Sequence, residues 1–140
     1  MIEGLSHITF IVKDLERASN FLTCVFEAKE IYSSGEKKYS YSKEKYFSVN
    51  GLWFAIMEGE PLSEKTYNHV ALKVSDKDLV KYEKRIRSLG LEILNDRSRV
   101  DGEGSSIYFY DYDNHLFELH TGTLDQRLCT YKKQENIVKG

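Results

Sequence analysis

Three side chains in this sequence are of types that bind metals. Two of them are histidines in similar apolar stretches, and the third is a glutamate between apolar neighbours. His7 lies in the apolar stretch LSHITFIVKD (5 to 14) and His69 lies in YNHVALKVSD (67 to 76). Glu118 lies in DNHLFELHTG (113 to 122), whose alternation predicts a strand with the carboxylate between apolar neighbours. An isolated carboxylate is costly to bury, and a nearby cation would offset that cost. Two imidazoles and one carboxylate suit a divalent ion such as Mn, Fe, Ni or Zn.

The elements that must position these side chains form an internal repeat. Both histidine stretches read as a short strand that ends in an aspartate, seven residues after the histidine, and Asp14 and Asp76 can each cap a following helix. Gly90 supplies a stop signal for the second helix. Apolar residues recur at helical spacing in the two segments, at Leu15, Ala18, Leu22 and Val25, and at Leu79, Tyr82, Ile86 and Leu89.

Three strand-like segments follow each helix, so the fold class is predicted as α+β with two βαβββ modules that enclose a cleft. Module one covers about 1–60, module two about 66–122, and a C-terminal helix about 124–133, within a single domain of 140 residues. The predicted strands are 30–35, 46–50 and 52–59 in the first module, and 91–95, 105–111 and 115–122 in the second.

The repeat register sets Ala55 opposite Glu118, because Gly122 aligns with Gly59 at an offset of 63 residues (118 − 63 = 55). Equivalent strands would then carry His, Ala, His and Glu, which is three ligands and one open coordination position, as catalytic sites require. The competing interpretation is that the histidines are hydrogen-bonded core residues. His120 shares the predicted face of Glu118 outside the repeat register and is predicted to lie behind the ligands or at the surface.

Composition excludes several classes of protein. A hydrophobic content of 41% predicts a globular chain, and a net charge of −2 gives no reason to expect nucleic acid. Cys24 and Cys129 are predicted to be reduced thiols, with a long-range disulfide as the minor option. No secretion signal or membrane-spanning apolar run is evident, so we expect a cytoplasmic protein.

Three blocks, GLSHITFIVKDL, YNHVA and SSIYFYDYDNHLFELHTGTLDQRL, resemble the fosfomycin-resistance proteins of the vicinal oxygen chelate (glyoxalase/bleomycin-resistance) superfamily. The resemblance runs from Gly4 to about Tyr131. It implies the vicinal oxygen chelate fold, a homodimer, and a divalent metal, manganese by family precedent. It also implies the ligands His7, His69 and Glu118, with His7 contributed by one subunit and the other two ligands by its partner.

Among the three subtypes, the chain resembles the hydrolase type, called FosX, which adds water to the fosfomycin epoxide. The segment SSGEKKYSYSKEKYFSVNGLWFAIMEG carries this resemblance, and Glu44 within it matches the general base. The glutathione-using type has a lysine where this chain has Ser98, and the other thiol-using type has a cysteine where Thr9 lies.

The resemblance also implies substrate contacts. Ser106, Tyr108 and Arg127 match phosphonate-binding positions. The hydroxyl groups of Ser106 and Tyr108 alternate onto one face of their strand, and the guanidinium of Arg127 offers a fork of N–H donors, so all three suit that role. One of Arg97 and Arg99 is expected to add positive charge. The remaining positions line the family's substrate cavity: Thr9, Tyr46, Trp53 and Tyr67.

Three alternatives stay open. The chain could transfer a thiol to fosfomycin on the same scaffold, or bind a drug without chemistry, or act on another phosphonate or epoxide. From composition alone, Glu44 would be a solvated charge between Lys43 and Lys45, which an extended strand places on the opposite face.

Overall fold

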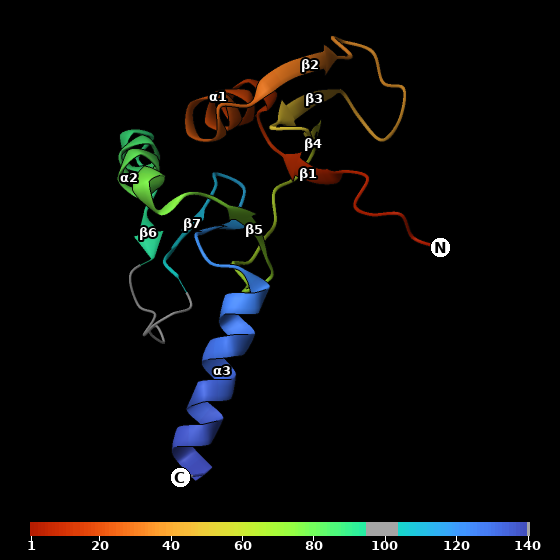
Figure 1. Ribbon diagram of the computed structural model, residues 1–140. Helices are drawn as coiled ribbons and strands as arrows, with labels where there is room; N and C mark the ends of the chain where they lie inside the picture. The colour runs from red at the N-terminus through yellow and green to blue at the C-terminus, as the bar shows by residue number, and fades with distance from the viewer. Residues whose placement is uncertain (95–103, 140) are drawn as a thin grey trace. The chain divides into compact units, whose positions relative to one another are not determined.

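The computed structural model describes residues 1–94 and 104–139. They form two compact units of α+β type, the first comprising Met1–Thr66 with Tyr110–His115, and the second Tyr67–Phe109 with Leu116–Gly140. The elements in chain order are β1 (Ile8–Val12), α1 (Leu15–Phe26), β2 (Lys29–Ser33), β3 (Glu44–Val49), β4 (Leu52–Glu58), β5 (His69–Lys73), the 3₁₀ turn η1 (Asp76–Asp78), α2 (Leu79–Ser88), β6 (Ile93–Leu94), β7 (Ser106–Tyr110), β8 (Leu116–His120) and α3 (Leu124–Lys139) (Figure 1).

The two sheets repeat one topology and one register. Their strand orders are β1-β4-β3-β2 and β5-β8-β7-β6, and the first strand of each pairs in parallel with the last. In the first sheet Thr9 pairs with Ala55, and in the second Ala71 pairs with Glu118. Because Thr9 follows His7 by two residues as Ala71 follows His69, the predicted equivalence of Ala55 and Glu118 is confirmed.

Helix α1 shows why its sequence is helical. Asp14 caps it, since its carboxylate accepts the backbone N–H of Arg17 at 3.0 Å, as predicted. The helix buries an apolar face, and it ends at Glu27, whose φ of 56° turns the backbone into the left-handed region without a glycine. The residues of the buried face are Ala18, Phe21, Leu22, Val25 and Phe26.

The start of the second helix differs from the prediction. Asp76 does not cap α2; it lies inside η1, and no side chain caps either element. The polar segment between β5 and α2 takes up a tighter 3₁₀ turn first, so the helix begins two residues later, relative to the histidine, than in the first unit. Its end was predicted correctly: Gly90 follows with a φ of 75° and donates its N–H to the Arg87 carbonyl at 3.0 Å.

The turn between β7 and β8 is built around Asp113, which is 2% exposed. Its carboxylate accepts the Lys13 backbone N–H at 3.0 Å, and its carbonyl accepts the Leu62 N–H at 3.3 Å. The guanidinium of Arg17 lies 4.6 Å from the ring centre of Tyr112. These contacts account for the assignment of Tyr110–His115 to the first unit.

Helix α3 begins with a reciprocal cap. Thr123 Oγ1 accepts the Gln126 N–H at 3.2 Å, and Gln126 Oε1 accepts the Thr123 N–H at 2.9 Å. The helix runs to Lys139, six residues beyond the predicted end, because nothing in its sequence stops it. None of the helices in the described part of the chain has the length and apolar character needed to cross a membrane.

Candidate metal and substrate site

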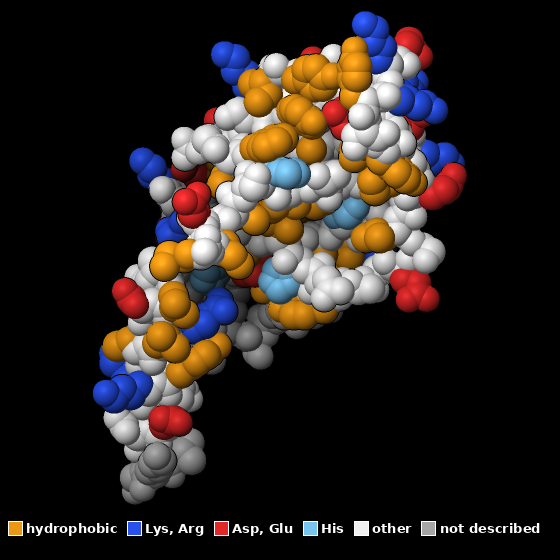
Figure 2. Space-filling model, turned by 90° about the vertical axis from the view of Figure 1, so that its right-hand side faces the viewer, with side chains coloured by type: hydrophobic (Ala, Val, Ile, Leu, Met, Phe, Trp, Pro, Cys, Tyr) orange, Lys and Arg blue, Asp and Glu red, His pale blue; other side chains and the backbone are white. Residues whose placement is uncertain are grey.

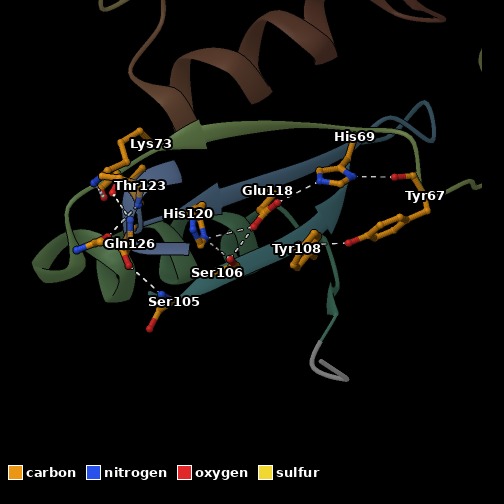
Figure 3. A network of polar contacts seen from close by, with 12 residues as sticks. Tyr67, His69, Lys73, Ser105, Ser106, Tyr108, Glu118, His120, Thr123 and Gln126 are labelled. Atoms are coloured by element: carbon orange, nitrogen blue, oxygen red, sulfur yellow. Dashed lines mark hydrogen bonds and ion pairs between the residues drawn. The ribbon is translucent and has the colours of Figure 1, made fainter. Parts of the chain in front are cut away.

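His69 and Glu118 come together in the second unit. His69 is the first residue of β5, and Glu118 lies in the middle of the adjacent strand β8. Glu118 is 4% exposed. The Nε2 atom of His69 lies 3.1 Å from Oε1 of Glu118 (Figure 3). Their separation of 49 residues in sequence is bridged by the parallel pairing of the two strands.

The proton on His69 can be placed from its partners. Its Nδ1 atom lies 2.7 Å from the Tyr67 carbonyl oxygen, which can only accept, so Nδ1 carries the hydrogen. Nε2 of His69 therefore faces a carboxylate oxygen at 3.1 Å, a position where either a proton or a metal cation can join the two atoms. The donor set therefore fits a divalent metal ligated by an imidazole and a carboxylate.

The second oxygen of Glu118 is held by a relay. Ser106 Oγ lies 2.6 Å from Glu118 Oε2 and also 2.6 Å from His120 Nδ1. Ser106 has one proton, which it donates to the carboxylate, so His120 Nδ1–H must donate to the serine oxygen. His120 therefore lies behind Glu118, which is one of the two positions predicted for it from the sequence.

These contacts outweigh the effect of burial on Glu118. Burial alone would raise the pKa of its carboxyl group. The hydrogen bonds from Ser106 and Tyr108 and the nearby His120 and His69 together hold that pKa below its ordinary value. The carboxylate is thus kept ionised, which is the state a metal ligand needs.

Tyr67 and Tyr108 flank the same pair. Their hydroxyl oxygens are 3.4 Å apart, and the Tyr67 ring centre lies 4.8 Å from that of His69. Burial, the Tyr67 hydroxyl and the charge of Glu118 raise the pKa of Tyr108, so its phenol stays protonated. The single phenolic proton of Tyr108 is directed at Glu118 in this structure.

In the first unit, His7 belongs to a row of aromatic rings. It stacks on Trp53 with ring centres 4.1 Å apart, and Trp53 contacts Tyr46 at 5.1 Å. Thr9 and Tyr46 are the two register partners of Ala55. Within the described residues, no three His, Cys, Asp or Glu side chains come together as a possible metal site.

Glu44 lies on this same face of the first sheet and is 5% exposed, so it is not a solvated charge. Tyr46 donates its hydroxyl proton to Glu44 Oε1 at 2.8 Å. Lys45 faces the other way and pairs with Glu16 of α1 at 2.9 Å. Lys43 likewise pairs with Glu58 at 3.5 Å. The alternation expected for SYSKEKYF is thus observed.

A hollow of about 630 Å³ lies on that opposite face and is not the candidate site. Its lining includes Lys43, Lys45, Glu16 and Glu58, whose charges largely pair with one another. These four side chains are engaged in ion pairs, whereas Glu44 points to the other side of the sheet.

The structure thus gathers the predicted residues in two groups. Among the described residues, the Arg127 side chain makes no hydrogen bond or ion pair with either group; it is half-buried in the first turn of α3. Arg97, Arg99 and Ser98 lie outside the described residues. The groups are His69, Glu118, Ser106, Tyr108 and Tyr67 in the second unit, and His7, Thr9, Glu44, Tyr46 and Trp53 in the first.

Two supporting residues were missed from sequence. Ser34 is 7% exposed, accepts the Glu44 N–H at 2.9 Å and donates its own N–H to the Glu44 carbonyl at 3.0 Å. Nothing in the run SSG marks it. Asp113 could have been suspected, because aspartate in the turn DYDN is of the type that binds backbone N–H groups.

Comparison with known proteins places this geometry in context. The model of the Glyoxalase/Bleomycin resistance protein/Dioxygenase superfamily matches residues 4–119. The chain is 60% identical over 133 residues to the fosfomycin resistance protein FosX of Listeria innocua, covering 95% of this chain and 100% of that protein. It is 36% identical over 138 residues to the metallothiol transferase FosB of Bacillus licheniformis, covering 96% and 85% of the two.

A solved structure is similar as well. It is a mutant of FosX from Listeria monocytogenes complexed with Mn(II) and 1S,2S-dihydroxypropylphosphonic acid. The TM-score is 0.86 with 56% identity, and the match covers 94% of this chain and 99% of that one. The compound in that crystal is a phosphonate that carries two adjacent hydroxyl groups.

Proposed function

The chain belongs to the Glyoxalase/Bleomycin resistance protein/Dioxygenase superfamily, and from that premise we propose that it hydrolyses the epoxide of fosfomycin and thereby gives resistance to the drug. The observation that carries the proposal is the full-length similarity to FosX, whose crystal structure holds a dihydroxypropylphosphonic acid. A vicinal diol is the product of adding water to an epoxide. Similarity to the thiol-using FosB is much lower, at 36% identity.

Glu44 is the proposed general base. As the water oxygen forms a bond to one epoxide carbon, the bond from that carbon to the ring oxygen breaks, and Glu44 takes the proton that water loses. The ring oxygen takes a proton from solvent water and becomes the second hydroxyl group, and Glu44 later returns its proton to the solvent. The burial of Glu44 supports this role, because a carboxylate shielded from bulk water is held in one place for the proton transfer.

His7, His69 and Glu118 are the residues that would hold a divalent cation, for which we propose Mn²⁺, the ion in the similar FosX structure. A cation bound there would act as a Lewis acid toward the epoxide oxygen. The 3.1 Å approach of His69 Nε2 to Glu118, and the relay that holds the other oxygen of Glu118, support this assignment.

The clamp on the phosphonate is assigned to Tyr108, Ser106 and Arg127. Tyr108 stays protonated, and its hydroxyl and that of Ser106 bond to Glu118 here, so both would have to turn toward a bound phosphonate. Arg127 offers a fork of N–H donors that fits two phosphonate oxygens. The remaining assigned contacts with the substrate are Thr9, Trp53 and Tyr67.

A homodimer with shared sites completes the proposal. His7 and the pair of His69 with Glu118 lie in different units. Apolar side chains also lie exposed along one side of α3, which supports association with a second copy: Leu124, Leu128 and Tyr131 are 70%, 54% and 47% exposed (Figure 2). The free thiols of Cys24 and Cys129 support a cytoplasmic location.

Phosphorus NMR of fosfomycin with the Mn²⁺-loaded protein tests the reaction, with and without added thiol. Appearance of the diol without thiol supports hydrolysis. Loss of the epoxide only when thiol is present would make the chain a thiol transferase, as the resemblance to FosB allows. Protection of bacteria at stoichiometric protein levels, with no turnover, would make it a drug-binding protein.

A further inference from the structure

Glu44 is fixed at three points within the first unit. Both of its backbone polar groups bond to the buried Ser34, at 2.9 Å and 3.0 Å. Its carboxylate accepts the Tyr46 hydroxyl at 2.8 Å through Oε1. Residues 44 and 46 share one face of β3, so the strand itself brings the donor to the carboxylate.

Tyr46 is in turn held by rings on both sides. Its ring centre lies 5.0 Å from that of Tyr32 on β2 and 5.1 Å from that of Trp53 on β4. Trp53 stacks on His7, so ring contacts run from Tyr32 across the sheet to a predicted metal ligand. Aromatic packing of this kind restricts the χ angles of Tyr46 and so fixes its hydroxyl.

The single phenolic proton of Tyr46 is committed to Glu44. The hydrogen bond to Glu44, together with burial, raises the pKa of Tyr46, which keeps the proton in place. A phosphonate dianion has only acceptor oxygens, so it needs donors. Tyr46 therefore cannot bind the phosphonate and hold Glu44 at the same time.

We propose that Tyr46 is a positioning residue that acts through Glu44, and not a substrate-binding residue as the sequence predicted. By occupying Oε1 it orients the carboxylate so that Oε2 is left to accept the proton of the attacking water. This inference rests on the proposed function, because it assumes that Glu44 is the base. Without the Tyr46 donor, Glu44 could rotate about its χ angles and leave the reactive geometry.

The test is a double-mutant cycle on the Mn²⁺-loaded full chain with fosfomycin. Tyr46→Phe keeps the ring and its contacts and removes only the donor. We expect kcat to fall roughly 10-fold, the scale of one hydrogen bond to a charged group, with KM within about 2-fold of the wild type. In a Glu44→Gln background the same substitution should change kcat by less than about 2-fold, since the base is already absent.

Tyr32→Phe is the matched control, because it removes a hydroxyl from the neighbouring ring and should leave kcat unchanged. A higher KM with normal kcat in Tyr46→Phe would show a substrate contact and overturn the inference. An equal loss of kcat in both backgrounds would do the same. If Glu44→Gln alone hydrolyses at the wild-type rate, the proposed base is wrong, and the failure lies there rather than with Tyr46.

Discussion

The Nε2 atom of His69 lies 3.1 Å from a carboxylate oxygen of Glu118, and the other ring nitrogen of His69 is already bonded to a carbonyl. The imidazole and the carboxylate are thus both placed to ligate one cation. Hydrogen bonds from Ser106 and Tyr108, with His120 and His69 nearby, explain how a carboxylate that is 4% exposed is tolerated in the middle of β8. Predictions about the metal begin from this pair.

We predict that His7→Ala, His69→Ala and Glu118→Ala each abolish tight Mn²⁺ binding and hydrolysis while the fold survives. Three ligands leave no redundancy, so the loss should exceed the roughly 10–100-fold typical of outer-shell partners. Calorimetric titration with Mn²⁺ and circular dichroism measure the two effects. His115→Ala is the control, because His115 bonds Asp111 at 2.8 Å and should affect stability but not metal binding. A variant with full metal affinity would show that its residue is not a ligand.

We predict that inactive His7→Ala and inactive Glu118→Ala proteins regain activity when mixed. If each site takes His7 from one subunit and Glu118 from its partner, a heterodimer holds one intact site and one site with both defects. The assay is hydrolysis after subunit exchange, which native mass spectrometry can follow. Exchange without any recovery would mean that each site is made within one chain.

We predict that Glu44→Gln lowers hydrolysis by roughly 100-fold or more, the usual scale for a general base. Gln keeps the shape of the side chain but cannot take the proton from water. Binding of Mn²⁺ and fosfomycin should persist, since Glu44 contributes to neither. Single-turnover rates and equilibrium binding separate the two effects, and near-wild-type hydrolysis would remove Glu44 from the mechanism.

We predict that Asp113→Asn changes how stability depends on pH. Burial, as the main cause, raises the pKa of Asp113 in the folded protein. The folded state therefore holds this proton more tightly than the unfolded state, and wild-type stability falls as pH rises from the ordinary aspartate range through the raised value. Asn does not titrate and can still accept the Lys13 N–H. The variant should gain stability relative to wild type as pH rises above the ordinary pKa of aspartate, about 4.

Urea unfolding of both proteins across that range gives the difference in free energy of unfolding. Asp14→Asn is a useful comparison, because Asp14 is an exposed cap whose side chain accepts the Arg17 N–H. A difference between wild type and Asp113→Asn that stays constant with pH would contradict the prediction.

The repeat in the sequence predicted most of the fold, because side-chain periodicity is a local property of each segment and a duplicated sequence repeats one pairing register. The equivalence of Ala55 and Glu118 followed from an offset alone and agrees with the pairing of both sheets. Asp76 misled, since an aspartate before a helix signals a cap only if the backbone there is extended. The hydrogen bond from Tyr46 to Glu44 could not be predicted from the sequence, because it depends on side-chain rotamers that packing selects.

The turn Tyr110–His115 has a consequence for how the chain can be divided. The strands that it connects, β7 and β8, belong mainly to the second unit, but the side chains and backbone of the turn itself bond to residues of the first unit. A fragment that ends at Thr66 would lack the buried Asp113, leaving the Lys13 N–H without its acceptor. The duplication is therefore plain in the sequence, yet the first half cannot be cut out as an independent protein without losing contacts that its own interior needs.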